Sequence, residues 1–205
     1  MAHKEEIIKH ASKMFVEQGI KAVRMDDIAQ ELSISKRTLY EIFGDKEELI
    51  YQSIRYYSEQ SRDRRLSQIT SDSTALETMV CNLRGMMDSA PIAGRMRRNM
   101  RRFYPSVYER LERDVQSKSM HDLENWVDSC VNNGYFEKSI NREHTIKLLH
   151  NSVHGMLINT LHDETPSNEL IEMTFYALLI FIRGLCTTEG QRLFDSCKSK
   201  YFKKI

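Results

Sequence analysis

Cationic and hydroxyl-bearing side chains are concentrated in one short stretch near the N-terminus. Between residues 35 and 46 they are Ser35, Lys36, Arg37, Thr38, Tyr40 and Lys46, and Arg24 lies a little before them. Such groups donate hydrogen bonds to phosphate oxygens, and the lysines and arginines add positive charge. Motifs of catalysis are missing, since the sequence has no glycine-rich phosphate loop, no G-x-S-x-G and no H-E-x-x-H. The set therefore predicts recognition of a polyanion, with no catalytic residue.

Three short helices are expected to position these groups. Apolar residues at helical spacing predict helices over 4–18, 25–32 and 36–43, and Ser33-Ile34-Ser35 forms a tight turn between the last two. Ser35 is a good N-cap for the third helix. This helix should turn Leu39 and Phe43 inward and its basic face outward. The order is that of a helix-turn-helix, whose second helix enters the major groove of DNA.

The stretch from Ala11 to Ile50 resembles the DNA-binding region of the TetR/AcrR family of bacterial transcriptional regulators. The matching positions are Ala11, Phe15, Gly19, Ile28, Ala29, Ser35, Thr38, Leu39, Tyr40, Phe43, Lys46 and Leu49. The resemblance implies a homodimer that represses transcription by binding a near-palindromic operator in double-stranded DNA. Two positions depart from the family pattern. Arg24 stands where the family usually has a serine or threonine N-cap, and Arg37 stands where it often has glycine.

Each predicted contact has an alternative. Tyr40 and Lys46 are interpreted as phosphate contacts, although either could be an ordinary surface residue. Thr38 contacts DNA or bonds back to its own helix, and Lys36 and Arg37 reach either base edges or the backbone. Residues 1–50 contain eight Lys and Arg but ten Asp and Glu, a net charge of −2. We therefore expect a small basic face with few phosphate contacts in each subunit.

The rest of the chain is predicted to be helical, with no strand. The expected helices span 45–65, 74–89, 92–103, 106–133, 143–161, 169–185 and 189–201, with Pro91 ending the second of these. The fold class is therefore all-α. We expect a DNA-binding domain at residues 1–50, with the helix-turn-helix at about 25–44. A helical domain for dimerisation and ligand binding should occupy residues 51–205.

Apolar residues of the C-terminal part suggest two further sites. A ligand pocket is predicted from Met86, Met96, Phe103 and Trp126, although such residues are often simply core. A dimer interface is predicted on the last two strong helices, and its candidates are Leu149, Met156, Leu157, Leu178 and Phe181. No cofactor or metal is expected.

Some features of the C-terminal part keep two interpretations. His150 and His154 lie four residues apart, as core or interface histidines or as a metal pair. The four cysteines are read as buried thiols, with a redox switch as the alternative. The arginine-rich run from Arg95 to Arg102 could pair with the protein's own acids, bind an anion or contact DNA.

Composition is that of an ordinary globular protein. The 205 residues carry a formal net charge of +1 and are 40% hydrophobic, and no apolar run reaches the ~20 residues that span a bilayer. We expect a cytoplasmic protein without a membrane partner. The predicted function is a transcriptional repressor released by a small molecule. The alternatives are an activator, a regulator controlled by a partner protein, and a helical enzyme or carrier.

Overall fold

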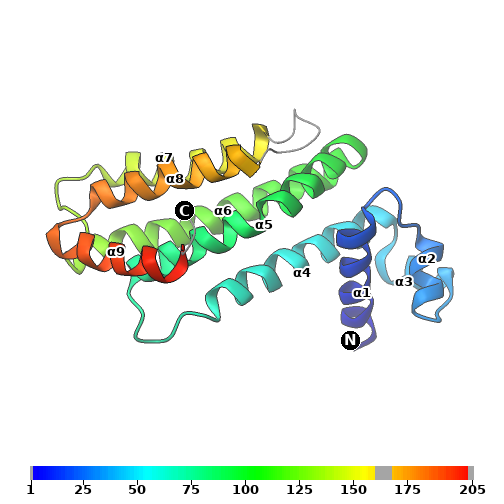
Figure 1. The fold of residues 1–205 in the computed structure, drawn as a ribbon. Helices are drawn as coiled ribbons and strands as arrows, with labels where there is room; N and C mark the ends of the chain where they lie inside the picture. Colours follow the sequence, from blue (N-terminus) through cyan, green and yellow to red (C-terminus); the bar gives the residue numbers. More distant parts are fainter. Residues whose placement is uncertain (1, 160–167, 203–205) are drawn as a thin grey trace. The chain divides into compact units, whose positions relative to one another are not determined.

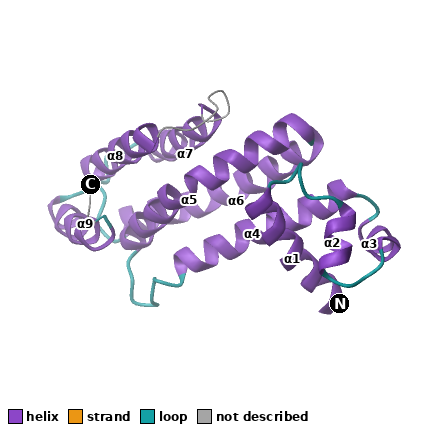
Figure 2. Ribbon diagram, turned by 45° about the vertical axis from the view of Figure 1, so that its right-hand side comes forward, coloured by secondary structure: helices purple, strands orange, loops and turns teal. Residues whose placement is uncertain are grey.

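The structure is a computed structural model, and it describes residues 2–159 and 168–202, without the side chains of residues 2 and 156–159. The described residues form α-helices joined by loops (Figures 1 and 2). These helices are α1 (Ala2–Gln18), α2 (Met25–Glu31), α3 (Lys36–Phe43), α4 (Lys46–Leu66), α5 (Ala75–Phe103), α6 (Pro105–Asn132), α7 (Arg142–Asn159), α8 (Asn168–Leu185) and α9 (Thr188–Tyr201). The all-α prediction is confirmed.

Local sequence signals set most of the helix ends. Gly19, Gly44 and Gly134 follow α1, α3 and α6, and their φ angles are +94°, +78° and +76°. Glycine adopts these left-handed angles without steric cost, which is why it commonly follows a helix. Pro105 occupies the first position of α6, where a missing backbone N–H costs nothing.

The prediction for Pro91 is wrong, because α5 runs through it without a break. A proline within a helix removes one backbone hydrogen bond and crowds the preceding turn, at a cost of ~3 kcal/mol. Buried residues lie on α5 on both sides of the proline, among them Leu83, Ala90, Met96 and Met100. Packing of this long apolar face offsets the local penalty, so the two expected helices form one.

The chain divides into two compact units. The first contains residues 1–62 and 95–115, and the second contains residues 63–94 and 116–205. The N-terminal helices thus share a unit with the last turns of α5 and the first turns of α6. This unit includes residues from both sides of the domain boundary expected near residue 50.

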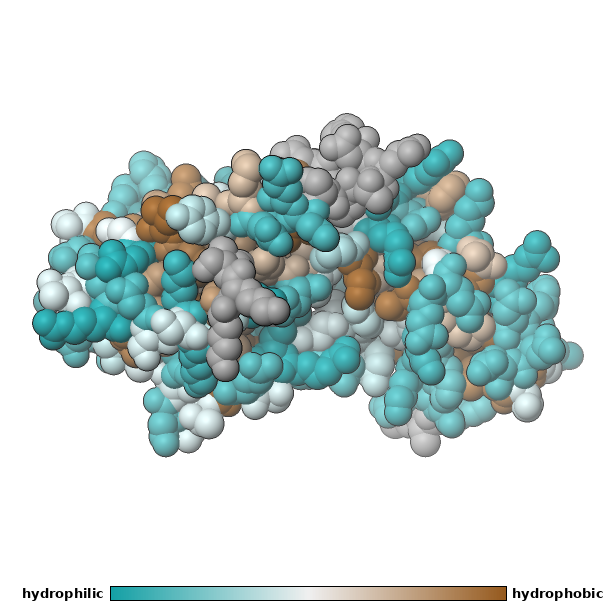
Figure 3. All heavy atoms as spheres, in the orientation of Figure 1, coloured by the Kyte–Doolittle hydropathy of each residue, from teal (hydrophilic) through white to brown (hydrophobic). Residues whose placement is uncertain are grey.

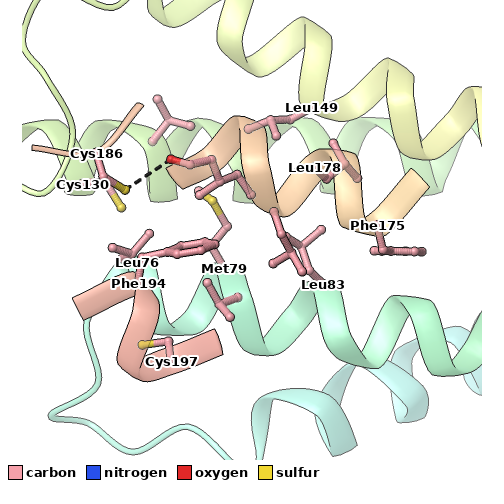
Figure 4. Close-up of a cluster of buried hydrophobic side chains, with 14 of the residues drawn as sticks. Leu76, Met79, Leu83, Cys130, Leu149, Phe175, Leu178, Cys186, Phe194 and Cys197 are labelled. Carbon is pink, nitrogen blue, oxygen red and sulfur yellow. Dashed lines mark hydrogen bonds between the residues drawn. The ribbon is translucent and has the colours of Figure 1, made fainter. Parts of the chain in front are cut away.

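The core of the second unit is drawn in Figure 4. It joins residues of α5, α6, α7, α8 and α9, including Leu76, Leu149, Phe175 and Phe194, all nearly inaccessible to solvent. Cys130 and Cys186 are also buried there, and desolvation raises the pKa of each thiol to about 12. Because the thiolate is the reactive form, these two cysteines act as small apolar residues at neutral pH.

A polar cluster fastens α9 to α5 inside the second unit. The Lys200 ammonium and the Tyr201 hydroxyl donate to the Glu77 carboxylate at 2.7 and 2.9 Å. The bond from Lys200, assisted by Tyr201, holds the pKa of Glu77 below its usual value, although burial acts in the opposite direction.

We expect Glu77→Gln to lower the free energy of unfolding by about 1 kcal/mol at pH 7. The folded-state pKa is depressed, so this stabilisation is present above the ordinary glutamate pKa and is lost as the pH falls below it. Urea unfolding of wild type and variant should therefore converge below about pH 4. Glu109→Gln, at an exposed glutamate, is the control. A difference that stays constant down to pH 3 would contradict this role for Glu77.

Candidate nucleic-acid interface

The turn between α2 and α3 is closed by local hydrogen bonds. The backbone N–H of Ile34 donates to the Ala29 carbonyl at 2.9 Å, and Ser33 takes a φ of +52°. Ser35 caps α3 as predicted, because its Oγ accepts from the Thr38 N–H at 3.0 Å. Leu39 is fully buried and α2 packs against α3, so the second helix of the motif is fixed in orientation (Figure 1).

The opposite side of α3 is exposed and polar. The Arg37 side chain is 87% exposed and Tyr40 is 42% exposed, so both guanidinium and phenol face solvent. Thr38 is half-buried, and its Oγ1 lies 2.8 Å from the Ser35 Oγ. The structure thus brings five of the predicted residues together, namely Ser35, Lys36, Arg37, Thr38 and Tyr40.

Acidic neighbours hold the two cations of α3. The Lys36 ammonium lies 2.9 Å from Asp26, and the Arg37 Nε lies 2.8 Å from Glu41. The bond to Asp26 raises the pKa of Lys36 above its usual value. Both pairs are exposed, so each is a weak interaction that a phosphate or a base edge can replace.

Arg24 precedes α2 and is exposed. A guanidinium has no acceptor, so this side chain cannot cap the helix. Asp27 partly replaces the missing cap, because its carboxylate accepts a hydrogen bond from the Arg24 backbone N–H at 2.7 Å. The guanidinium itself faces solvent, where an external anion can reach it.

Lys46 has a different environment from the one expected of a phosphate contact. Its ammonium donates to the Ile20 carbonyl at 3.0 Å and lies 5.3 Å from the centre of the Tyr104 ring. The residue is half-buried. Lys46 therefore ties the start of α4 to the loop between α1 and α2, and any phosphate must compete with that carbonyl.

A series of contacts between α4 and α6 was not found by sequence reasoning. Within the first unit, Ser106 bonds to Glu47 at 2.5 Å, Arg110 to Glu48 at 2.6 Å, and Tyr51 to Asp114 at 2.5 Å. The Arg110 guanidinium also stacks 3.4 Å above the Tyr51 ring. These contacts join residues about sixty positions apart, and they fix the start of α4 against α6.

The sequence of the helix-turn-helix matches a known protein family. Residues 7–52 match the family model described as bacterial regulatory proteins, tetR family. Residues 7–52 are therefore similar to the tetR family of bacterial regulatory proteins. The matched residues contain α2, α3 and every predicted DNA-contacting side chain.

Solved structures of transcriptional regulators share the fold of this chain. A regulator from Cytophaga hutchinsonii is 18% identical, with a TM-score of 0.78 over 91% of this chain and 100% of that one. A TetR-family regulator from Pectobacterium atrosepticum is 20% identical, with a TM-score of 0.69 over 91% and 95%. A regulator from Saccharomonospora viridis in complex with choline is 17% identical, with a TM-score of 0.67 over 89% and 96%. The comparison with curated proteins gives no match.

The predicted pocket residues are divided between the two units of the chain. Met96 and Phe103 lie in the first, and Met86 and Trp126 lie in the second. Met96 is buried, and Met86 and Trp126 are half-buried against the core of the second unit. That they line one ligand pocket stays a prediction.

The predicted dimer residues separate into two groups. Leu149 and Leu178 are buried in the core of their own protomer, so they offer little surface to a partner. The prediction that these two residues form the dimer interface is therefore wrong. Phe181 is half-buried beside the same core, and the side chains of Met156 and Leu157 lie outside the described part. Among the side chains that the structure describes on α7 and α8, the large exposed apolar ones are instead Leu148, Met173, Tyr176 and Ile180. Figure 3 shows hydrophobic side chains at the surface over these helices.

The histidine pair of α7 is stacked. The rings of His150 and His154 are 5.9 Å apart, and the His154 Nε2 lies 3.5 Å from the Gln116 amide of α6. Across residues 2–159 and 168–202, no three His, Cys, Asp or Glu side chains are grouped as a metal site would need. Over the same residues, no helix is both long and apolar enough to cross a bilayer.

Proposed function

We propose that this regulator is a repressor that binds a near-palindromic operator as a homodimer and leaves it when a small molecule binds. The observation that carries the proposal is the outward face of α3, where Lys36, Arg37 and Tyr40 are exposed on a capped helix of fixed orientation. Such a face reads base edges in the major groove with its cations and contacts phosphates with its hydroxyls. Binding DNA places its action in the cytoplasm.

The exposed face of α8 supports the homodimer. Met173, Tyr176 and Ile180 are spaced by three and four residues, so they share one side of the helix, and Leu148 of α7 is exposed as well. Apolar side chains of this size are costly to leave in water on a helix whose opposite side is already buried. A second copy covers them in a two-fold interface, which also supplies two recognition helices to a palindrome.

Ligand control is supported by the size of the second unit and by one structural relative. The similar regulator from Saccharomonospora viridis holds choline, which shows that this fold accommodates a small molecule. Adaptable residues such as Met86 and Trp126 lie at the edge of the core in the second unit. A ligand that prefers one spacing of the recognition helices lowers operator affinity by its differential binding.

Selection of bound duplexes from a random-sequence pool tests the proposal. The expected product is a near-palindrome with half-sites about one helical turn apart, ~34–36 Å. A reporter placed downstream of this duplex should be repressed, and ligands found by thermal shift should release the protein. Activation of the reporter would favour an activator. Hits that leave operator affinity unchanged would exclude ligand release for the compounds tested.

Substitutions on α3 should separate affinity from specificity. Tyr40→Phe removes a phosphate-binding hydroxyl and should weaken binding to the selected and a scrambled duplex alike. Arg37→Ala should reduce the preference between them by roughly 1–3 kcal/mol, the range for a bidentate pair with a base. Glu41→Gln is the matched control, because it frees Arg37 from its ion pair and should tighten binding. Fluorescence anisotropy measures the DNA affinity of all three variants. An unchanged affinity for every variant would show that this face of α3 does not bind DNA.

A further inference from the structure

A cleft beside the helix-turn-helix is lined by several exposed cations. It has a volume of about 440 Å³, and its lining includes Lys21, Arg24, Arg95 and Asn99, together with one acidic residue, Glu17. Arg102 lies near it, because Lys21 and Arg102 approach the same Phe103 ring at 4.2 and 5.1 Å. We call the group Lys21, Arg24, Arg95 and Arg102 the basic cleft. All of it belongs to the first unit.

The cations of the basic cleft lack the ion pairs that four other cations of this unit form. Lys36, Arg37, Arg97 and Arg110 each have a carboxylate partner within 2.9 Å. Within the part of the chain that the structure describes, none of the four cleft cations forms a salt bridge. Arg95 uses one N–H on the Val16 carbonyl at 2.7 Å, and a guanidinium has five. Glu17 also lines the cleft, but within the described residues it forms no salt bridge with these cations, so the cleft keeps a net positive charge that favours an anionic partner.

The last turns of α5 and the first turns of α6 add positive charge to the first unit. Residues 95–115 contain seven arginines and three acids, a net charge of +4 against the −2 of residues 1–50. Sequence reasoning placed these arginines in a separate domain. The structure instead joins them to the loop before α2.

We propose that the basic cleft binds the phosphate backbone of DNA that flanks the operator core. The inference rests on the proposed function and extends its DNA contact beyond the helix-turn-helix. Lys21, Arg24, Arg95 and Arg102 are all exposed, as a long polyanion requires, whereas a small organic ligand needs enclosing apolar walls. Arg24 belongs both to the cleft and to the start of α2, so the cleft is continuous with the predicted DNA face.

The test uses the full-length protein with Lys21→Gln and Arg102→Gln combined. The probes are the selected duplex with its flanking base pairs, the same duplex trimmed to its core, and a scrambled duplex of full length. Each phosphate contact removed should reduce the slope of log affinity against log salt by about 0.9, so loss of both should reduce it by about 1.8 per subunit. The reduction should be equal for selected and scrambled sequences, and trimming the flanks should weaken wild type but not the variant.

Two controls isolate the cleft. Lys138→Gln removes one exposed charge from the second unit and should leave the slope unchanged. Lys21→Arg with Arg102→Lys keeps the charges and should restore wild-type binding, whereas a packing role for these side chains would not be rescued.

If the double variant has the same salt slope as Lys138→Gln, or if its binding is weakened only on the selected sequence, the basic cleft does not bind flanking DNA. The proposed function is unaffected by either result. Wild-type protein that binds none of the duplexes overturns both the cleft and the proposed function.

Discussion

Ile180→Asp is expected to produce monomers and to lower operator affinity by about 10²-fold or more. The side chain is 56% exposed on α8, so the substitution leaves the core of its own protomer intact. In a two-fold interface the same change places two carboxylates against apolar residues of both subunits, where desolvation is costly. Loss of the second half-site removes an intramolecular binding step worth roughly 10²–10⁴ in affinity.

Sedimentation velocity and anisotropy on the selected duplex measure the two effects of Ile180→Asp together. Ser117→Asp adds the same charge at an exposed position of α6, outside the two helices of the proposed interface, and should remain dimeric. Phe181→Asp is a poorer test, because Phe181 packs beside the core and its replacement would also affect folding. A variant at Ile180 that sediments as the wild-type dimer would remove this face of α8 from the interface.

Gly190→Ala is expected to lower the free energy of unfolding by ~3 kcal/mol or more. An added Cβ at Gly190 would stand 2.0 Å from the Tyr135 carbonyl oxygen and 3.1 Å from the Cys186 Cβ. That oxygen accepts the Thr187 N–H at 3.0 Å, and the Thr187 hydroxyl caps α9 at the N–H of Gly190. Relief of the clash therefore requires moving backbone that holds α9 in place.

Gly184→Ala is the matched control for this experiment. Gly184 lies within α8, and an added Cβ there meets no atom within 4 Å. In the separate protomer, alanine at this open helical position should stabilise the protein by roughly 0.5–1 kcal/mol. Gly184 follows Ile180 by four residues, so a contact between copies in the proposed dimer would reduce this gain. Urea unfolding at one protein concentration compares both variants, since dimerisation makes stability concentration-dependent. Equal stability of the two would show that the contact at Gly190 relaxes without cost.

The helix-turn-helix could be predicted because its signals are local. The cap at Ser35, the buried Leu39 and the terminating Gly44 lie within ten residues and act on one another directly. The contacts of Lys46 and Tyr51 could not be predicted in this way. Their partners, Ile20 and Asp114, are 26 and 63 residues away, and only the folded chain brings them together.

The two errors in the C-terminal part have a common physical cause. At Pro91 a local penalty competes with packing along the whole of α5, and residue patterns give the penalty but not the packing. On α8, apolar residues cover nearly the whole circumference, so periodicity does not reveal which side faces the protomer's own core. Leu178 was therefore assigned outward, and Met173 and Ile180 were missed.

If α3 is the recognition helix, as proposed above, its ion pairs affect how the protein searches a chromosome. Asp26 and Glu41 act as built-in counter-ions for Lys36 and Arg37, so fewer solution ions are released when this helix meets an arbitrary stretch of DNA. Sites without the operator sequence then retain the protein only briefly, because replacing these carboxylates with phosphates gains little. A matching base pair gains more, since it offers the guanidinium two aligned acceptors. The acidic partners thereby reduce the occupancy of the many competing genomic sites relative to the operator.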